Sequence, residues 1–330
     1  MNKTLIKETY HAHLAFIKVV NGVGLTVIFC SLGASIFSID YLGEKMTYNP
    51  KNIRDFLRKN VYHGKTIGRV AGRIKDSKIV IKNKTIKLAS NEGVNTLHGG
   101  KGAISEKAFK HLIKKYDDKV QILFSYLSRD CEAGFPGDAR IEICYTIYNK
   151  EAKIDIDLSC KVSETCPISL TNHSYFCLAE HNINNLSLYV NASQFIEMNP
   201  INLVMERAKE VPSFLDFRSL KPLINDIDHK EMNVGMLKGY DHFLLLDKQE
   251  DEKPQISLEN SKFRLDIFTD FDGVVIYTDN YDPKFKANNS KEKIRRGIAI
   301  EPQLNSLGDR LLNKNELFKH YITYRFEEKH

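Results

Sequence analysis

Apolar and polar residues alternate through short stretches along most of the chain. In residues 153–162, KIDIDLSCKV, Ile154, Ile156 and Leu158 fall on one side of an extended backbone. Asp155 falls on the other side, as expected for a strand with one buried and one solvated face. Similar runs, separated by turn residues, cover residues 78–89, 119–128, 140–149, 263–270 and 273–280. Many strands at such short spacing indicate an all-β antiparallel sandwich or barrel, and we expect a single large antiparallel β-sandwich.

Helical periodicity is scarce in this sequence. Only residues 52–60 and 105–116 show a pattern that predicts short helices, and strands do not alternate with helices as in parallel α/β proteins. No Pro-rich or Ser-rich linker divides the chain, so residues 1–330 are predicted to form one domain. The polar segment 286–297 is predicted to be a surface loop.

One stretch raises the question of a membrane segment. Residues 19–39 contain no charged residue and are long enough to cross a bilayer. Glycine, serine and asparagine residues interrupt them and leave two β-like pieces, 25–33 and 34–43. We therefore expect two paired core strands and no membrane span. The first residues of the chain also lack the apolar core of a signal peptide.

Composition is that of a soluble globular protein, with 42% hydrophobic and 27% charged residues. The net charge is +6, but lysines and acidic residues are interspersed, so we expect no nucleic-acid partner, which would favour a basic face. The cysteines form no C-x-x-C pair and show no zinc-finger spacing. We expect reduced thiols in a cytoplasmic protein at Cys30, Cys131, Cys144, Cys160, Cys166 and Cys177.

Common cofactor and nucleophile motifs do not fit this chain. Gly64 and the two residues after it resemble the end of a phosphate-binding loop, but Lys59 stands where that loop requires a glycine. No G-x-S-x-G nucleophile motif is present. His11 and His13 form a possible metal pair without further ligands nearby. We therefore expect neither a cofactor nor a bound metal.

Five segments place a polar residue in a glycine-rich or apolar setting. They are IGRVAGRI at 67–74, NTLHGG at 95–100, LTNHSYF at 170–176, GYDHF at 239–243 and IAIEPQ at 298–303. Each has a structural explanation when it is taken alone. A histidine can fill a turn or a core position, an aspartate can hold a turn, and an arginine or a glutamate can be a surface charge.

In this order and spacing, the five segments resemble the aldose 1-epimerase family, and the resemblance covers nearly the whole chain. It implies a galactose mutarotase-like β-sandwich and an isomerase that interconverts the α and β anomers of a free aldohexose, galactose or glucose, without metal or cofactor. It assigns His173 as general acid, Glu301 as general base and His98 as a ring-oxygen contact. It assigns the binding of the sugar to Arg73, Asp241, Asn172 and Tyr175.

The reaction that the resemblance implies needs these residue types. A cyclic hemiacetal opens when its ring oxygen gains a proton while the C1 hydroxyl loses one, and a positioned acid and base catalyse both transfers. Histidine titrates near neutrality and can return the proton that it gives. We expect the imidazole and the carboxylate to flank the sugar from opposite sides. The expected partner is a small monosaccharide, and the protein is expected to be a monomer or a homodimer.

The sequence also departs from the family pattern. It has no tryptophan, and Phe109 stands near the place where the family commonly has one. Cys177 replaces a usual asparagine after the TNHSYF segment, and Pro302 follows the proposed base. These departures affect the expected substrate preference and efficiency more than the fold.

Three alternative functions remain open. A non-catalytic carbohydrate-binding relative would share the fold. Loss of the acid or the base would favour this alternative, but the sequence retains both residues. A sugar-phosphate epimerase would need further cations, and Arg69 is the only nearby candidate. A glycoside hydrolase would need two catalytic carboxylates, whereas only Glu301 has a suitable setting.

Overall fold

Antiparallel strands dominate the computed structural model. The model describes residues 4–50, 52–58, 61–199, 205–232, 238–250, 252–280, 295–305 and 310–329. Every strand ladder within them is antiparallel. The predicted all-β class is therefore confirmed.

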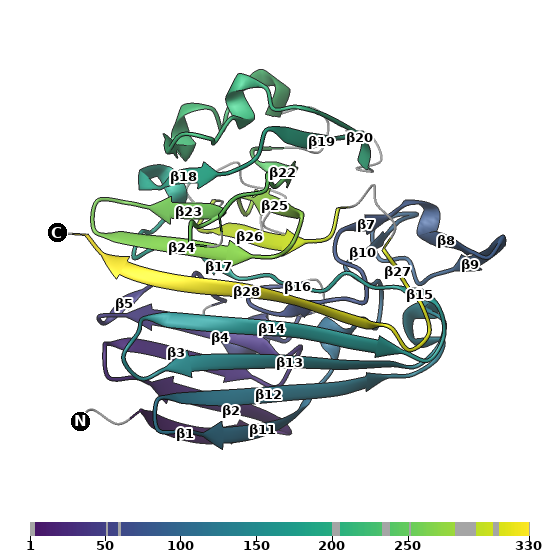
Figure 1. The fold of residues 1–330 in the computed structure, drawn as a ribbon, viewed down its shortest axis with the longest axis horizontal. Coiled ribbons are helices and arrows are strands. Elements are labelled where there is room, and N and C mark those ends of the chain that lie inside the picture. Colours follow the sequence, from purple (N-terminus) through teal and green to yellow (C-terminus); the bar gives the residue numbers. More distant parts are fainter. Residues whose placement is uncertain are drawn as a thin grey trace.

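Two of the larger sheets face each other in the lower part of Figure 1. One has five strands in chain order, β1 Leu5–His11, β2 Leu14–Val20, β3 Leu25–Cys30, β4 Ser35–Tyr41 and β5 Glu44–Lys45. The other has nine strands in the order β11 Lys110–Lys115, β12 Lys119–Ser128, β13 Ala139–Tyr148, β14 Lys153–Val162, β28 Leu317–Glu328, β24 Phe263–Thr269, β23 Ile256–Glu259, β18 Ser187–Val190 and β21 Lys221–Pro222. Phe29 of β3 contacts Tyr145 of β13, with ring centroids 4.7 Å apart. The interior between the two sheets is thus aromatic and aliphatic.

A third large sheet lies in the upper part of Figure 1. Its six strands run in the order β17 Tyr175–Phe176, β26 Ile298–Gln303, β25 Gly273–Tyr277, β22 Asp241–Leu245, β19 Gln194–Met198 and β20 Met205–Glu210. Phe176 of β17 contacts Tyr324 of β28, with ring centroids 5.0 Å apart. This contact packs the six-stranded sheet against the nine-stranded one.

Short ladders and helical turns complete the described residues. The two-stranded ladders pair β7 Arg73–Ile74 with β10 Thr96–Leu97, β6 Thr66–Ile67 with β16 Thr171–Asn172, β8 Lys78–Ile81 with β9 Lys84–Lys87, and β15 Cys166–Pro167 with β27 Leu311–Leu312. The helical segments are α1 Ile53–Phe56 and the 3-10 turns η1 Lys75–Ser77, η2 Ile104–Glu106, η3 Glu132–Gly134, η4 Ile183–Asn185, η5 Ser213–Leu215, η6 Leu223–Asn225 and η7 Lys230–Met232.

The hydrophobic core draws on all three larger sheets. Val27 of β3, Ile156 of β14 and Ile300 of β26 are fully buried in the same cluster, and each such side chain contributes roughly 1.5–3 kcal/mol by leaving water. Along β14, buried and partly exposed positions alternate as the sequence predicts. One domain over residues 1–330 remains our prediction, and the shared core is consistent with it.

One helix prediction is confirmed and the other is wrong. The helix α1 forms within residues 52–58, and the Asn52 side chain caps it by accepting from the Asp55 N–H. In residues 105–116, however, only the start is helical, and β11 Lys110–Lys115 is an edge strand. Its backbone pairs with β12 from Lys110 to Lys115. Hydrogen bonding to a neighbouring strand therefore outweighs the weak helical periodicity of this segment.

The uncharged stretch from 19 to 39 folds as predicted into paired core strands. β3 and β4 form a ladder in which Val27 lies opposite Ile39. No helix within the described part of the chain is both long and apolar enough to cross a membrane.

Most of the predicted loop at 286–297 lies outside the described residues. All six cysteines are unpaired.

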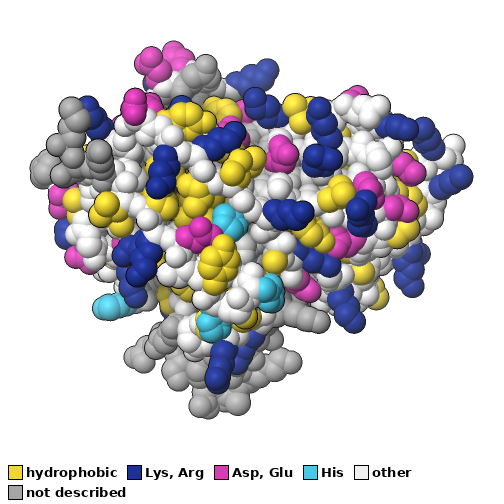
Figure 2. Space-filling model, turned by 90° about the horizontal axis from the view of Figure 1, so that it is seen from below, with side chains coloured by type: hydrophobic (Ala, Val, Ile, Leu, Met, Phe, Trp, Pro, Cys, Tyr) yellow, Lys and Arg dark blue, Asp and Glu magenta, His cyan; other side chains and the backbone are white. Residues whose placement is uncertain are grey.

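Charged side chains are spread over the surface. Figure 2 shows Lys and Arg side chains scattered among acidic and hydrophobic ones on one face of the molecule. The described side chains on that face form no basic stripe of the kind that nucleic-acid binding favours.

Candidate active site

His98 lies in a tight turn that follows β10. His98, Gly99 and Gly100 all have positive φ, at 52°, 85° and 81°. A Cβ at position 99 would lie 2.0 Å from the backbone oxygen of Gly68, so only glycine fits there. The turn brings His98 against Gly72: the His98 N–H donates to the Gly72 carbonyl over 3.0 Å, and the Gly72 N–H donates to His98 Nδ1 over 3.3 Å.

The contact with Gly72 determines which nitrogen of His98 carries the proton. Because Nδ1 accepts from an N–H, the single proton of a neutral ring lies on Nε2. Burial, reinforced by the charges of His173 and Arg73, holds the pKa of His98 well below its ordinary value. His98 is therefore a neutral ring with a fixed N–H donor.

The β7–β10 ladder places Arg73 beside this turn, opposite Leu97. Its Nε and Nη2 donate to the two carboxylate oxygens of Glu92 over 2.7 and 3.0 Å. Its Nη1 lies 3.8 Å from Oδ2 of Asp241, at the start of β22. Sequence reasoning missed Glu92, which lies outside every motif and occupies one edge of the guanidinium. The Nη1 group beside Asp241 is left as the donor for a ligand.

His173 and Glu301 meet where β16 contacts β26. His173 Nε2 lies 3.1 Å from Glu301 Oε1, and only 4% and 2% of the two side chains are exposed. Among the described residues, His173 Nδ1 and Glu301 Oε2 have no hydrogen-bond partner. We expected the two groups on opposite sides of a sugar. The structure instead places them side by side, so they can reach only neighbouring atoms of a ligand.

Burial changes the protonation of this pair. It raises the pKa of Glu301 well above its ordinary value, with repulsion from Asp241 adding to the rise and Arg73 partly offsetting it. It lowers the pKa of His173 to about 3. Both shifts favour neutral forms, so the pair holds one proton. That proton can sit on the carboxyl or, after transfer across the contact, on the imidazole without changing the net charge.

Backbone contacts with the end of the Tyr62–Lys65 segment position His173. Its N–H donates to the Lys65 carbonyl over 3.0 Å, and its carbonyl accepts from the Gly64 N–H over 2.8 Å. Gly64 has a φ of 68°, and a Cβ there would lie 1.8 Å from the oxygen of Ile36. Only glycine permits this approach, which explains why a glycine is needed at position 64, four residues before the GRVAGRI segment.

Asn172 is fully buried, and protein groups satisfy both ends of its amide. Its Nδ2 donates to the Gly64 carbonyl over 3.1 Å and to the Tyr145 hydroxyl over 3.4 Å. Its Oδ1 accepts from Ser174 over 2.6 Å and from Tyr324 over 3.4 Å. Asn172 thus supports the backbone of the site, and its expected contact with a sugar stays a prediction.

Aromatic rings surround the catalytic candidates. Tyr175 stacks on His173 with ring centroids 5.0 Å apart, and His63 stacks on the Tyr175 ring at 4.1 Å. Tyr62 contacts His98 at 4.7 Å and His173 at 5.8 Å. Sequence reasoning identified Tyr175 but missed Tyr62 and His63, whose only signal is their place just before the GKTIGR segment.

The departures from the family pattern are accommodated by the fold. Phe109 is buried in the main hydrophobic core against Tyr126. Cys177 is also buried. Pro302 lies opposite Val274 of β25, beyond the part of β26 that pairs with β17. Its missing N–H therefore removes no bond from a second neighbouring strand.

Gln303 is a further residue that the sequence did not single out. It lies two positions after Glu301, on the same face of β26. It is 1% exposed, and its Oε1 has no partner among the described residues. A Cβ on Gly72 would lie 3.9 Å from this atom. An unsatisfied acceptor so close to the His98 turn makes Gln303 a candidate ligand-binding residue.

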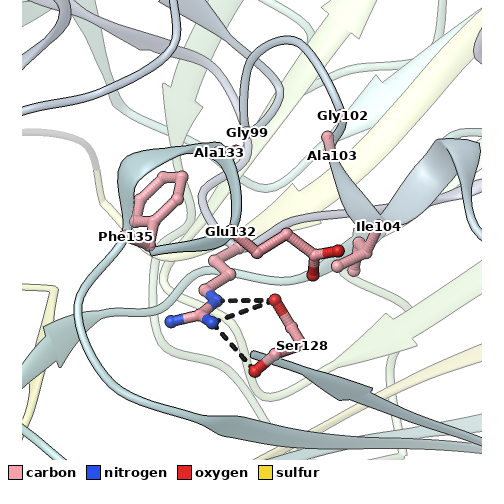
Figure 3. Close-up of a pocket in the computed structure, with 9 residues that line it drawn as sticks. Gly99, Gly102, Ala103, Ile104, Ser128, Glu132, Ala133 and Phe135 are labelled. Carbon is pink, nitrogen blue, oxygen red and sulfur yellow. Dashed lines mark hydrogen bonds between the residues drawn. The ribbon is translucent and has the colours of Figure 1, made fainter. Parts of the chain in front are cut away.

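Arg69, the cation considered for a sugar phosphate, is bound by protein groups instead. It is 2% exposed. Its guanidinium donates to Ser128 Oγ from Nε and Nη2 and to the Ser128 carbonyl; Figure 3 draws these bonds as the dashed lines that reach the labelled Ser128. It also donates to the backbone carbonyls of Arg129, Pro136 and Gly137. Arg69 therefore fixes the loops around it and does not face a ligand.

The site also has the composition of a metal triad. His98, His173 and Glu301 each offer one ligand atom within 4.8 Å of the others. However, the backbone amide that donates to His98 Nδ1 leaves the other nitrogen protonated, so this neutral ring has no free lone pair for a metal. The geometry suits hydrogen bonding better than coordination. Among the described residues, no group of three potential ligands includes His11 or His13.

Comparison with known proteins agrees with the fold. A model of the aldose 1-epimerase family matches residues 16–325. The chain belongs to the aldose 1-epimerase family. Aldose 1-epimerase of Escherichia coli K12 is 26% identical to it over 279 residues, covering 79% of this chain and 77% of that protein. Galactose mutarotase of Bos taurus is 30% identical over 239 residues, covering 69% and 66%.

Solved structures of aldose 1-epimerase relatives show the same fold. A galactose 1-epimerase from Lactobacillus acidophilus NCFM aligns over 100% of both chains with a TM-score of 0.90 and 24% identity. An aldose epimerase homologue from C. elegans aligns over 99% of this chain and 100% of that chain, with a TM-score of 0.81 and 24% identity. The expected galactose mutarotase-like fold is confirmed.

Proposed function

We propose that this protein is an aldose 1-epimerase that interconverts the α and β anomers of a free aldohexose, galactose or glucose. The observation that carries the proposal is the 3.1 Å contact between His173 Nε2 and Glu301 Oε1. In mutarotation, both oxygens that exchange protons are bonded to C1 of the sugar. An acid and a base that serve them must therefore lie close together, as these two side chains do.

The shared proton of the pair supports the reaction. His173 gives its proton to the ring oxygen while Glu301 accepts the proton of the C1 hydroxyl, and the C1–O5 bond breaks to give the open-chain aldehyde. Rotation about C1–C2 and the reverse transfers close the ring on the other face. The pair holds one proton before and after the reaction, so no external acid or base is consumed.

The neighbouring residues have roles that follow from their contacts. The Nε2–H of His98 is fixed as a donor by the Gly72 amide and suits the ring oxygen, where negative charge develops. Arg73 Nη1 and the Asp241 carboxylate lie together and suit adjacent sugar hydroxyls. Tyr175 supplies an aromatic surface stacked on the His173 ring.

The contacts speak against the alternatives. A non-catalytic relative would not need a buried acid–base pair in which one oxygen and one nitrogen have no partner among the residues that the structure describes. A sugar-phosphate enzyme would need an available cation, but protein carbonyls bind Arg69. Arg73 is paired with Glu92 and lies near Asp241, so it offers little net charge to a phosphate.

Polarimetry tests the proposed activity. Freshly dissolved α-galactose or α-glucose should reach anomeric equilibrium faster with the protein than without it. Glu301→Gln and His173→Asn should each reduce the acceleration by roughly a hundred- to ten-thousand-fold, the usual contribution of a general acid or base. The exposed residues His181 and Glu250 provide matched controls, His181→Asn and Glu250→Gln, which should retain full activity. Wild-type activity in either site variant would contradict the assigned roles.

A further inference from the structure

A second pocket lies outside the residues of the candidate active site. It has a volume of about 310 Å³, which is within the range of small-molecule sites. Three leucines, Leu14, Leu32 and Leu57, form its apolar wall, and Lys65 lines it from the segment before β6. Neither the family assignment nor the proposed reaction gives this pocket a role.

Lys65 is a buried cation whose side chain has no hydrogen-bonded or ion-paired partner among the described residues. Its side chain is 3% exposed. Its ammonium lies 4.9 Å from the ring centroid of Phe56 in α1. A cation–π contact offsets only part of the cost of removing an ammonium from water. Glu106 attracts Lys65 from a greater distance, but within the described ranges no carboxylate forms an ion pair with the Lys65 Nζ.

The wall next to Lys65 is continuous with a small hydrophobic cluster. Leu14, Cys30, Leu32 and Phe56 form this cluster, which is separate from the main core. A ligand whose charged end meets Lys65 would therefore place an apolar portion against the leucines. Although Arg58, His11 and His13 also line the pocket, a free phosphate would leave the leucine wall uncovered, so an anion with an apolar portion fits this lining better.

The other charges at the pocket limit the ligand to one negative group. Arg58 already pairs with Asp55 at 3.1 Å and is about half exposed. Glu106, a partly buried carboxylate, also lines the pocket. A second carboxylate on the ligand would meet this negative charge.

We propose that this pocket binds a small monocarboxylate with an apolar tail, with its carboxylate on Lys65 Nζ and its tail against Leu14, Leu32 and Leu57. The proposal is independent of the mutarotase activity, because it concerns the Lys65 side chain, whereas the candidate active site uses only the Lys65 backbone carbonyl. It predicts preference for a monocarboxylate over both the matching alcohol and the matching dicarboxylate.

Binding should also depend on pH. Burial lowers the pKa of Lys65 to about 8, so the ammonium that attracts the carboxylate is present below that value and is lost above it. Between pH 7 and pH 10, affinity should therefore fall as pH rises. The other titratable or charged groups that face the pocket or Lys65 are Cys30, Glu106, Arg58, His11 and His13. Burial raises the pKa of Cys30 to about 11, so its thiol stays neutral over most of the interval from pH 7 to pH 10.

Calorimetric titration of the protein at pH 7 tests the proposal with hexanoate, hexanol and adipate as probes. Hexanoate should bind saturably with one-to-one stoichiometry, and hexanol and adipate should bind roughly tenfold more weakly or not at all. Lys65→Met keeps the length of the side chain but removes its charge, and it should abolish hexanoate binding. Lys101→Met, at an exposed lysine, is the matched control and should bind as wild type.

A second variant tests the apolar wall without touching the charge. Leu57 is 41% exposed, so Leu57→Ser should fold normally and weaken hexanoate binding several-fold. Circular dichroism checks that each variant is folded. Absence of saturable hexanoate binding, equal binding of hexanol or adipate, or unchanged binding to folded Lys65→Met would each overturn the proposal.

Discussion

Arg69 and Glu301 are equally buried, each with 2% of its surface exposed, but their surroundings differ. The Arg69 guanidinium donates from all three nitrogens to Ser128 and to backbone carbonyls. Glu301 has one close partner, His173, and its Oε2 has none among the described residues. Burial alone therefore does not distinguish a structural charge from a functional one. What distinguishes the two is how completely other protein groups satisfy the hydrogen bonds of the buried charged group.

The largest expected effect tests this difference through stability. Arg69→Met leaves Ser128 and several buried carbonyls without a donor, so the free energy of unfolding should fall by about 3–5 kcal/mol. Glu301→Gln removes a group that the fold satisfies poorly, so it should change the same quantity by less than about 1 kcal/mol or increase it. Urea denaturation followed by circular dichroism measures both.

Arg129→Met provides the control, because the Arg129 side chain is 73% exposed and its loss should cost less than about 0.5 kcal/mol. A stable Arg69→Met protein, or a Glu301→Gln protein as unstable as we expect for Arg69→Met, would remove the distinction between the two buried charges.

Arg73 lies four residues after Arg69 in the same motif, and its substitution should affect activity more than stability. Arg73→Met removes a donor to the sugar hydroxyls and should lower kcat/KM by roughly ten- to a hundred-fold, mainly through KM. Steady-state polarimetry gives both constants. Arg207 donates to Glu197 over 3.0 Å and is 69% exposed, so Arg207→Met is a matched control with unchanged kinetics. A fall in kcat at constant KM would instead assign Arg73 to the chemical step.

The site could be predicted from sequence only where a motif marks it. The GRVAGRI segment contains both Arg69 and Arg73, and nothing in its letters shows that one guanidinium binds backbone carbonyls while the other faces a carboxylate. Glu92 reaches Arg73 from a loop without any motif, and the adjacency of His173 and Glu301 depends on contact between β16 and β26. Such contacts between distant segments have no local sequence signal.

More of the fold than of the site could be predicted from the sequence, because the alternation of apolar and polar residues shows which face of a strand is buried. In β14 the pattern KIDIDLSCKV matches burial position by position. In β11, by contrast, the predicted helix is wrong because this edge strand is stabilised by its ladder with β12 and has a weakly amphipathic sequence of its own. Local patterns predict strands well when one face enters the core and poorly at the edge of a sheet.

The dependence of kcat/KM on pH sharpens the comparison between Arg69 and Glu301, because it tests whether Glu301 shares a single proton with His173. As pH falls, the pair gains a second proton and loses its base; because burial lowers the pKa of His173 to about 3, this acid limb should lie near that value. As pH rises, the pair loses its only proton, and the raised pKa of Glu301 places this limb well above the ordinary carboxyl range. Beyond each limb, kcat/KM should fall about tenfold per pH unit. Polarimetry with the uncatalysed rate subtracted measures it, and an acid limb near pH 6.5 would show that His173 behaves as an exposed histidine.

The smallest expected effect concerns Glu92, which satisfies one edge of Arg73 as the carbonyls satisfy Arg69, but only partly and with 27% of its side chain exposed. Glu92→Gln keeps one acceptor and removes the charge, so kcat/KM should fall roughly two- to fivefold and stability by about 0.5–1 kcal/mol. Glu197→Gln, at the ion pair between Glu197 and Arg207, is the control and should leave the kinetics unchanged. If Glu92→Gln abolished activity, the orientation of Arg73 would depend on Glu92 as strictly as that of Arg69 depends on its carbonyls, and the two arginines would no longer represent different kinds of buried charge.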